Sequence, residues 1–74
     1  MKGTTTYGQL TYFDTKEQEL QITTLEGNTI TFDMDTYIEL PEDTDWDTLM
    51  GKYVGVVEVD DMAIKIIWQG NRSY

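Results

Sequence analysis

"TITFDMDTYIELPEDTDWDTLMG", residues 29–51, decides the fold, because a strand pattern gives way to a helix pattern within it. Its first seven residues alternate between apolar and polar side chains, with Ile30, Phe32 and Met34 on one side. This period of two is typical of a half-buried strand. Pro41 follows and ends the strand, because proline has no backbone N–H to donate to a sheet.

The segment 42–51 predicts a short helix. Thr44 or Asp43 is expected to cap its start, and Gly51 is expected to stop it. Three apolar residues fall at helical spacing on one side and are predicted to plug the end of a barrel: Trp46, Leu49 and Met50.

Two predicted strands precede this stretch and two follow it. Residues 5–14 and 20–25 form the first pair, and Gly8 is expected to mark a bend or bulge in the first strand. Residues 52–60 and 62–69 form the last hairpin.

Three strands, a short helix and two strands indicate one all-β domain over residues 1–74. The layout favours an OB-like five-stranded barrel with its helix between the third and fourth strands. An SH3-like small barrel is the alternative, because such barrels share strand number and size. Trp68 alternates with Ile66 and is assigned to the core.

The negative charge is confined to the middle of the chain. The net charge is −9, and residues 17–50 hold ten acids and no base, whereas the rest holds four acids and five bases. Such a field repels phosphate backbones and acidic membranes and attracts basic proteins. We therefore expect neither direct nucleic-acid binding nor membrane binding. The chain has no apolar run of membrane-spanning length and no signal-peptide pattern, which predicts a cytoplasmic protein.

Nucleophilic catalysis with histidine or cysteine is excluded, because the chain contains neither residue and its one serine is Ser73. Residues 43–54 begin like a calcium-binding EF-hand loop, but Thr48 and Val54 stand where that loop requires glycine and glutamate. We predict a protein that is not an enzyme and has no cofactor and no metal site. Weak divalent-cation binding stays open.

Asp33, Asp35 and Glu39 alternate along the predicted strand and are expected to share an outward face with the acids that follow. One interpretation is that these acids keep a small barrel soluble and prevent edge pairing. The other is docking, because a surface of one sign costs stability by self-repulsion and is usually kept for steering. The predicted partner-binding residues are Asp33, Asp35, Tyr37, Glu39, Glu42, Asp43, Asp45 and Asp47.

The stretch "GQLTYFDTKEQELQI", residues 8–22, resembles the opening of cold-shock domains. It has the glycine, the paired aromatics Tyr12 and Phe13, and a turn that contains Lys16. The resemblance implies a barrel. It does not carry over nucleic-acid binding, because "KEQELQI" and "ITFDMD" occupy the positions where that family places stacking aromatics and histidine.

The predicted function is therefore that of a non-enzymatic module whose carboxylates imitate nucleic-acid phosphates and dock onto a basic, nucleic-acid-binding protein. In size and charge the chain resembles small acidic proteins of phages and mobile elements, including inhibitors of bacterial defence nucleases. Two alternatives stay open. One is a structural or assembly subunit that associates through its apolar last hairpin, as a homodimer or in a larger complex. The other is an OB-type domain that binds a ligand or nucleic acid.

Overall fold

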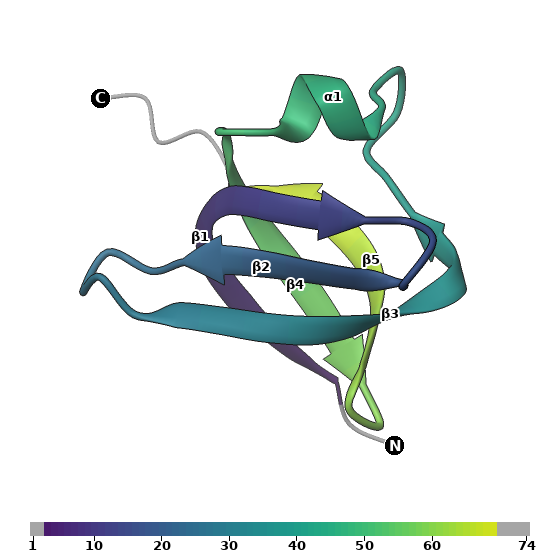
Figure 1. The fold of residues 1–74 in the computed structure, drawn as a ribbon, viewed down its shortest axis with the longest axis horizontal. Coiled ribbons are helices and arrows are strands. Elements are labelled where there is room, and N and C mark those ends of the chain that lie inside the picture. The colour runs from purple at the N-terminus through teal and green to yellow at the C-terminus, as the bar shows by residue number, and fades with distance from the viewer. Residues whose placement is uncertain (1–2, 70–74) are drawn as a thin grey trace.

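The computed structural model describes residues 3–69, which form five strands and one short helix (Figure 1). In chain order these are β1 (Thr4–Asp14), β2 (Glu19–Thr23), β3 (Thr29–Glu39), α1 (Trp46–Leu49), β4 (Tyr53–Val59) and β5 (Met62–Trp68). This order confirms the predicted sequence of three strands, a helix and two strands.

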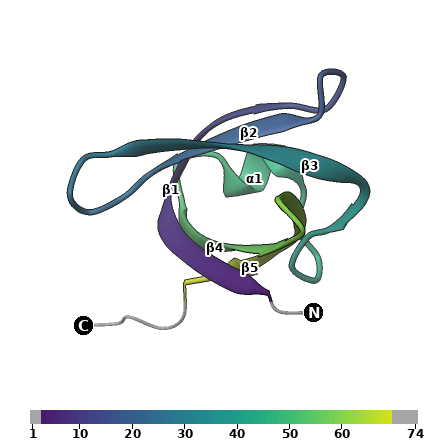
Figure 2. The ribbon, with the colours of Figure 1, turned by 90° about the horizontal axis from the view of Figure 1, so that it is seen from below.

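The strands close into a barrel in the order β1-β2-β3-β5-β4, and β4 pairs back onto β1. All neighbours are antiparallel except β3 and β5, which run parallel. Figure 2 shows the ring with α1 lying across its opening. With the helix between β3 and β4, this is the predicted OB-like layout rather than the SH3-like alternative. Within the part of the chain that the structure describes, no helix has the length and apolar character needed to cross a membrane.

β1 pairs with two strands, β2 and β4. Its residues up to Gln9 pair with β4, and those from Gln9 onward pair with β2. The register with β2 shifts between Leu10 and Tyr12, which leaves Thr11 as a β-bulge. Because of this extra residue, Leu10 is buried and Phe13 packs against the core, while Tyr12 lies on the outer surface.

A bend or a bulge was predicted at Gly8, and the bulge is wrong, because it lies at Thr11. Gly8 lies in a regular part of the β1–β4 ladder, opposite Val54. A Cβ atom placed on Gly8 would lie 2.7 Å from the carbonyl oxygen of Thr23, so glycine is needed here because the end of β2 passes close to the backbone.

The core lies inside the barrel and beneath α1. Phe32 and Met34 are buried as the strand pattern predicts, and the partly buried Ile30 packs against the core. The fully buried aliphatic side chains come from β1, β2, β4, β5 and the helix: Leu10, Leu20, Ile22, Leu49, Val54, Val56, Ala63 and Ile66.

Asp45 caps α1, which corrects the prediction of Thr44 or Asp43. The Asp45 carboxylate accepts a hydrogen bond from the N–H of Thr48 at 2.9 Å. The Thr44 hydroxyl instead donates to the carbonyl oxygen of Pro41 and thereby holds the turn before the helix.

The helix closes the barrel with two of its three predicted side chains. Leu49 is fully buried, and the Trp46 ring stacks on Phe13 with centroids 5.2 Å apart. Met50 remains 41% exposed, because the backbone has already left the helical conformation at this residue.

Trp68 does not lie in the core as predicted; it is 43% exposed. The β4–β5 register shifts so that Ile64 has no partner in β4. This bulge breaks the alternation, so Ala63 and Ile66 point inward and Met62 and Ile64 do not. Trp68 shares the inward phase of Ile66 but is the last residue of β5 and lines a groove beside residues 39–42.

Replacing Gly8 with alanine is expected to lower the free energy of unfolding by about 1–3 kcal/mol, because the new Cβ meets backbone that cannot move aside. Urea denaturation followed by tryptophan fluorescence measures this change. Gly55→Ala is the matched control. Its Cβ would meet the side chains of Tyr7 and Ile67, which can rotate away. A Gly8→Ala variant no less stable than Gly55→Ala would contradict the close approach of β2.

Candidate functional site

Three carboxylates from three strands lie side by side on the outer surface. Asp14 of β1 pairs with Glu19 of β2, and Glu19 pairs with Asp33 of β3. Directly paired residues face the same side of a sheet, with Cβ atoms about 4.5–5.5 Å apart. The preceding row points into the core: Phe13, Leu20 and Phe32. The acids therefore point outward, and we call them the carboxylate row.

Asp33 was predicted as a partner-binding residue, whereas Asp14 and Glu19 were not. Without the bulge at Thr11, alternation along β1 would place Asp14 in phase with Leu10, which is buried. The bulge reverses that phase and turns the carboxylate outward. The only available signal was the excess of polar and charged residues at the predicted turn between β1 and β2.

Tyr12 lies beside the carboxylate row, and its pKa is raised there. Its hydroxyl donates a 3.4 Å hydrogen bond to Asp14 Oδ2. Partial desolvation raises the pKa of Tyr12, and the negative charges of Asp14, Glu19 and Glu17 raise it further. Carboxylates that are separate in sequence thus act together at one surface position.

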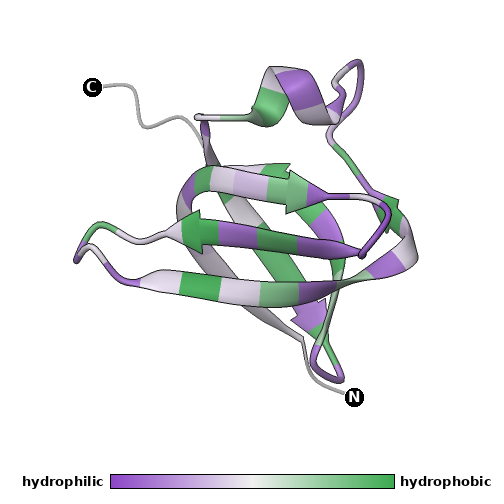
Figure 3. Ribbon diagram, viewed as in Figure 1, coloured by the Kyte–Doolittle hydropathy of each residue, from purple (hydrophilic) through white to green (hydrophobic). Residues whose placement is uncertain are grey.

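Two further acids extend the row, and we call the five together the acidic face: Asp14, Glu17, Glu19, Asp33 and Asp35. Glu17 lies in the β1–β2 turn, and Asp35 follows Asp33 on the outer side of β3. The β4–β5 turn, Asp60–Asp61, immediately precedes Met62, the β5 partner of Asp33. Figure 3 colours both turns as hydrophilic. Acids therefore occupy β2, β3 and the two loops beside them.

Hydrogen bonds to the backbone fix two of these carboxylates. Asp14 Oδ1 accepts from the N–H groups of Lys16 and Glu17 at 3.0 and 3.2 Å. Asp35 Oδ2 accepts from the N–H of Tyr37 at 2.8 Å. These bonds hold the carboxylates in place on the surface before any partner arrives.

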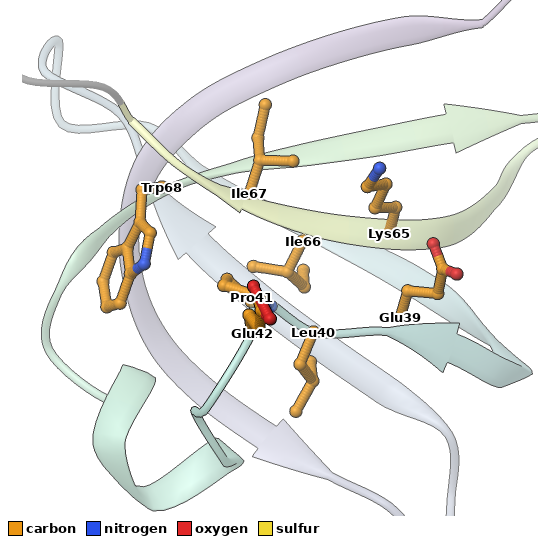
Figure 4. A pocket seen from close by; sticks show the side chains of 8 residues that line it. All are labelled: Glu39, Leu40, Pro41, Glu42, Lys65, Ile66, Ile67 and Trp68. Carbon is orange, nitrogen blue, oxygen red and sulfur yellow. The ribbon is translucent and has the colours of Figure 1, made fainter.

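The other predicted residues lie elsewhere. Glu39 is paired with Lys65 of β5, and Glu42 lies beyond the end of β3; both glutamates line a groove that Trp68 also lines (Figure 4). Tyr37 is 85% exposed on the outer side of β3, between Asp35 and Glu39.

Three predicted acids belong to the loop and helix at the end of the barrel. Asp45 caps α1, Asp47 lies in its first turn, and Asp43 adopts a left-handed conformation with φ of 59°. The structure therefore divides the predicted site into three parts and does not place all eight residues on one face. Within residues 3–69, no three carboxylates lie close enough together to hold a metal ion.

Comparison with protein-family models, with curated proteins and with solved structures found no match to this chain.

Replacing Asp45 with alanine is expected to lower the melting temperature by several degrees at neutral pH, because the cap of α1 is lost. The hydrogen bond from Thr48 lowers the pKa of Asp45 in the folded protein. The capping contribution is therefore complete above the unfolded-state pKa of about 3.9 and is lost as the pH falls through the lowered folded-state pKa.

Thermal melts of both proteins between neutral and strongly acidic pH measure the difference. It should be largest near neutrality and should shrink on acidification. The conservative variant Asp45→Asn should keep most of the stability, since asparagine also caps helices. A difference that grows as the pH falls would contradict the assigned cap.

Proposed function

We propose that this protein is a non-enzymatic binding module whose acidic face docks onto a basic surface of a nucleic-acid-binding protein. The observation that carries the proposal is the carboxylate row, in which Asp14, Glu19 and Asp33 are direct cross-strand neighbours. Like charges in such positions destabilise a sheet. A surface that costs stability in this way is usually retained for steering and docking.

The position of the acidic face in the barrel supports mimicry of nucleic acid. OB-folds bind oligonucleotides on the face of their second and third strands, between the β1–β2 and β4–β5 loops. In this protein that face carries Glu19, Asp33 and Asp35, and the loops carry Glu17 and Asp60–Asp61. The surface with which OB-folds bind nucleic acid is therefore negatively charged in this protein, as nucleic acid itself is. This disfavours direct binding of nucleic acid.

The spacing of the charges is also compatible with mimicry. Alternate residues along a strand, such as Asp33 and Asp35, lie about 6–7 Å apart, and neighbouring strands lie about 4.8 Å apart. A partner that binds successive phosphates with lysine and arginine would meet negative charges at comparable intervals. Docking would occupy its nucleic-acid site and inhibit it. The small size and acidity support a phage or mobile-element inhibitor that acts in the host cytoplasm.

The direct test is capture of partners from nuclease-treated host lysate, at about 50 mM and about 500 mM salt. The double variant Glu19→Gln/Asp33→Asn should capture roughly tenfold less partner at low salt, because it removes two of the three charges of the row. Added oligonucleotide should release the captured protein from the unmodified module.

A control variant, Glu26→Gln/Asp43→Asn, changes the net charge equally but lies outside the acidic face. It should capture as much partner as the unmodified protein. Equal loss with both variants would show that net charge alone acts and would overturn the proposal. Capture that oligonucleotide cannot displace would retain docking but contradict nucleic-acid mimicry.

A second candidate function is self-association or assembly through the last hairpin. Tyr7 of β1 lies across Gly55 beside Ile67, and the neighbouring Tyr53 is 49% exposed. This outer side of β1, β4 and β5 therefore presents apolar and aromatic surface. Light scattering across micromolar concentrations tests the candidate: a dimer that Tyr53→Ser disrupts would support it, and a strict monomer would exclude self-association.

A further inference from the structure

A groove opens where β2 separates from β1, and we call it the edge groove. Residues 5–8 of β1 form one wall, residues 24–26 of the β2–β3 loop form the other, and Gln69 also lines it. Its volume is about 360 Å³. Figure 2 shows the β2–β3 loop extending past β1, beyond the ring of strands. β1 and β2 are last paired at Gln9 and Thr23, so the groove lies where a longer β2 would have continued the ladder.

The backbone of β1 has an unpaired edge along this groove. The Leu10 N–H donates to the carbonyl oxygen of Lys52, and the Leu10 carbonyl oxygen accepts from the N–H of Gly51, so both groups point to the β4 side. Along an antiparallel strand, the direction of these groups alternates from residue to residue. The N–H and C=O groups of Thr5 and Tyr7 therefore point away from β4, toward the edge groove. In the described part of the chain, neither residue pairs with a strand on that side.

The sequence of this edge carries none of the usual protection against further pairing. Exposed edge strands are commonly protected by lysine, by proline or by a bulge. Residues 4–8, "TTTYG", include neither lysine nor proline, and the bulge of β1 lies further along, at Thr11. Threonine and tyrosine favour strands. The edge can therefore accept another strand without a change in its own conformation.

A buried oxygen atom in the same groove also lacks a partner. The side-chain Oε1 of Gln69 is buried, and no hydrogen-bond donor among the described residues reaches it. Buried polar atoms in folded proteins almost always have a partner. A ligand in the edge groove that carries N–H groups would supply a donor to this oxygen.

We propose that the edge groove binds an extended segment of a partner protein, which adds to the barrel as a strand antiparallel to β1. Thr5 and Tyr7 each donate one backbone hydrogen bond to the segment and accept one from it. A further N–H of the segment donates to Gln69 Oε1. The side chain of Tyr7, which is 47% exposed, packs beside side chains of the added strand.

The groove favours a single extended segment over other occupants. A compact apolar ligand would cover the backbone groups of Thr5 and Tyr7 without pairing them, which is unfavourable. Nucleic acid is disfavoured by the net charge of −9 and by Glu26 in the loop wall. The β1 edge of a second copy carries β4 on its other side, and that β4 would take the place of residues 24–26.

This proposal goes beyond the proposed function and does not rest on it. No residue of the edge groove belongs to the acidic face, and the binding uses backbone hydrogen bonds instead of charge.

The test is nuclear magnetic resonance titration of isotope-labelled protein with the blocked peptide acetyl-Thr-Val-Thr-Val-Thr-Lys-amide, which favours an extended backbone. In the control peptide the central residues are N-methylated, which removes their N–H donors. The amide resonances of Thr5 and Tyr7 should shift to saturation with the first peptide, and their exchange with solvent should slow. Binding of the control peptide should be at least about tenfold weaker. The amide of Thr6, which points to β4, is the internal reference and should change little.

Thr5→Pro should weaken binding of the peptide by at least about tenfold, because proline removes the N–H that points into the groove. That N–H does not bond to β4, so the variant should stay folded. Thr5→Val keeps the N–H and should bind as the unmodified protein does. Gln69→Met removes the Oε1 acceptor and should weaken binding by roughly three- to tenfold.

Equal binding of both peptides would overturn the proposal, as would the lack of a saturable shift with either peptide. The N-methylated peptide gives this test without any variant of the protein. Unchanged binding by Thr5→Pro would likewise show that the peptide does not pair with this edge.

The titration also separates this proposal from the proposed function. The affinity at about 500 mM salt should stay within about twofold of that at about 50 mM, because salt screens surface charges and not backbone hydrogen bonds. Shifts confined to Asp14, Glu19 and Asp33 would mean that the lysine of the peptide binds the acidic face, and would overturn the edge groove. A saturable shift of Thr5 and Tyr7 would support it even if partner capture did not depend on the acidic face.

Discussion

The register that joins β1, β2 and β3 is the constraint on which the rest of the structure depends. It aligns Phe13, Leu20 and Phe32 inside the barrel and Asp14, Glu19 and Asp33 outside it. Because side chains alternate along a strand, burying the first row forces the second row together. Burial of the apolar core thus keeps three carboxylates next to one another, although their mutual repulsion opposes this arrangement.

Where the strand pattern is regular, the sequence alone predicted the architecture. The alternation of β3, Pro41 after it and the helix signals before Gly51 were sufficient to predict the strand order and the place of the helix. The errors occurred where an extra residue breaks the alternation. Neither Thr11 nor Ile64 is a glycine, so nothing in the local composition marked these two bulges. For that reason Asp14 was missed. Trp68 was assigned to the core because it keeps the inward phase of Ile66, but it is the last residue of β5 and stays 43% exposed.

The stretch of acids that dominates the sequence separates into parts with different roles. Asp33 and Asp35 join the acidic face, Glu39 and Glu42 enter the groove, and Asp45 caps α1. Sequence distance could not reveal this division, because the 11 residues of β3 span more than one side of the barrel and the chain then crosses its end (Figure 2).

A double-mutant cycle on Glu19 and Asp33 tests the central claim most directly. Urea unfolding of the wild type, Glu19→Gln, Asp33→Asn and the double variant gives the coupling free energy between the two carboxylates. We predict a repulsive coupling of roughly 0.2–1 kcal/mol at low salt. It should disappear near 1 M salt, where the Debye length falls to about 3 Å. Effects that add without coupling at low salt would mean that the two carboxylates are not neighbours, and would contradict the register and the face built on it.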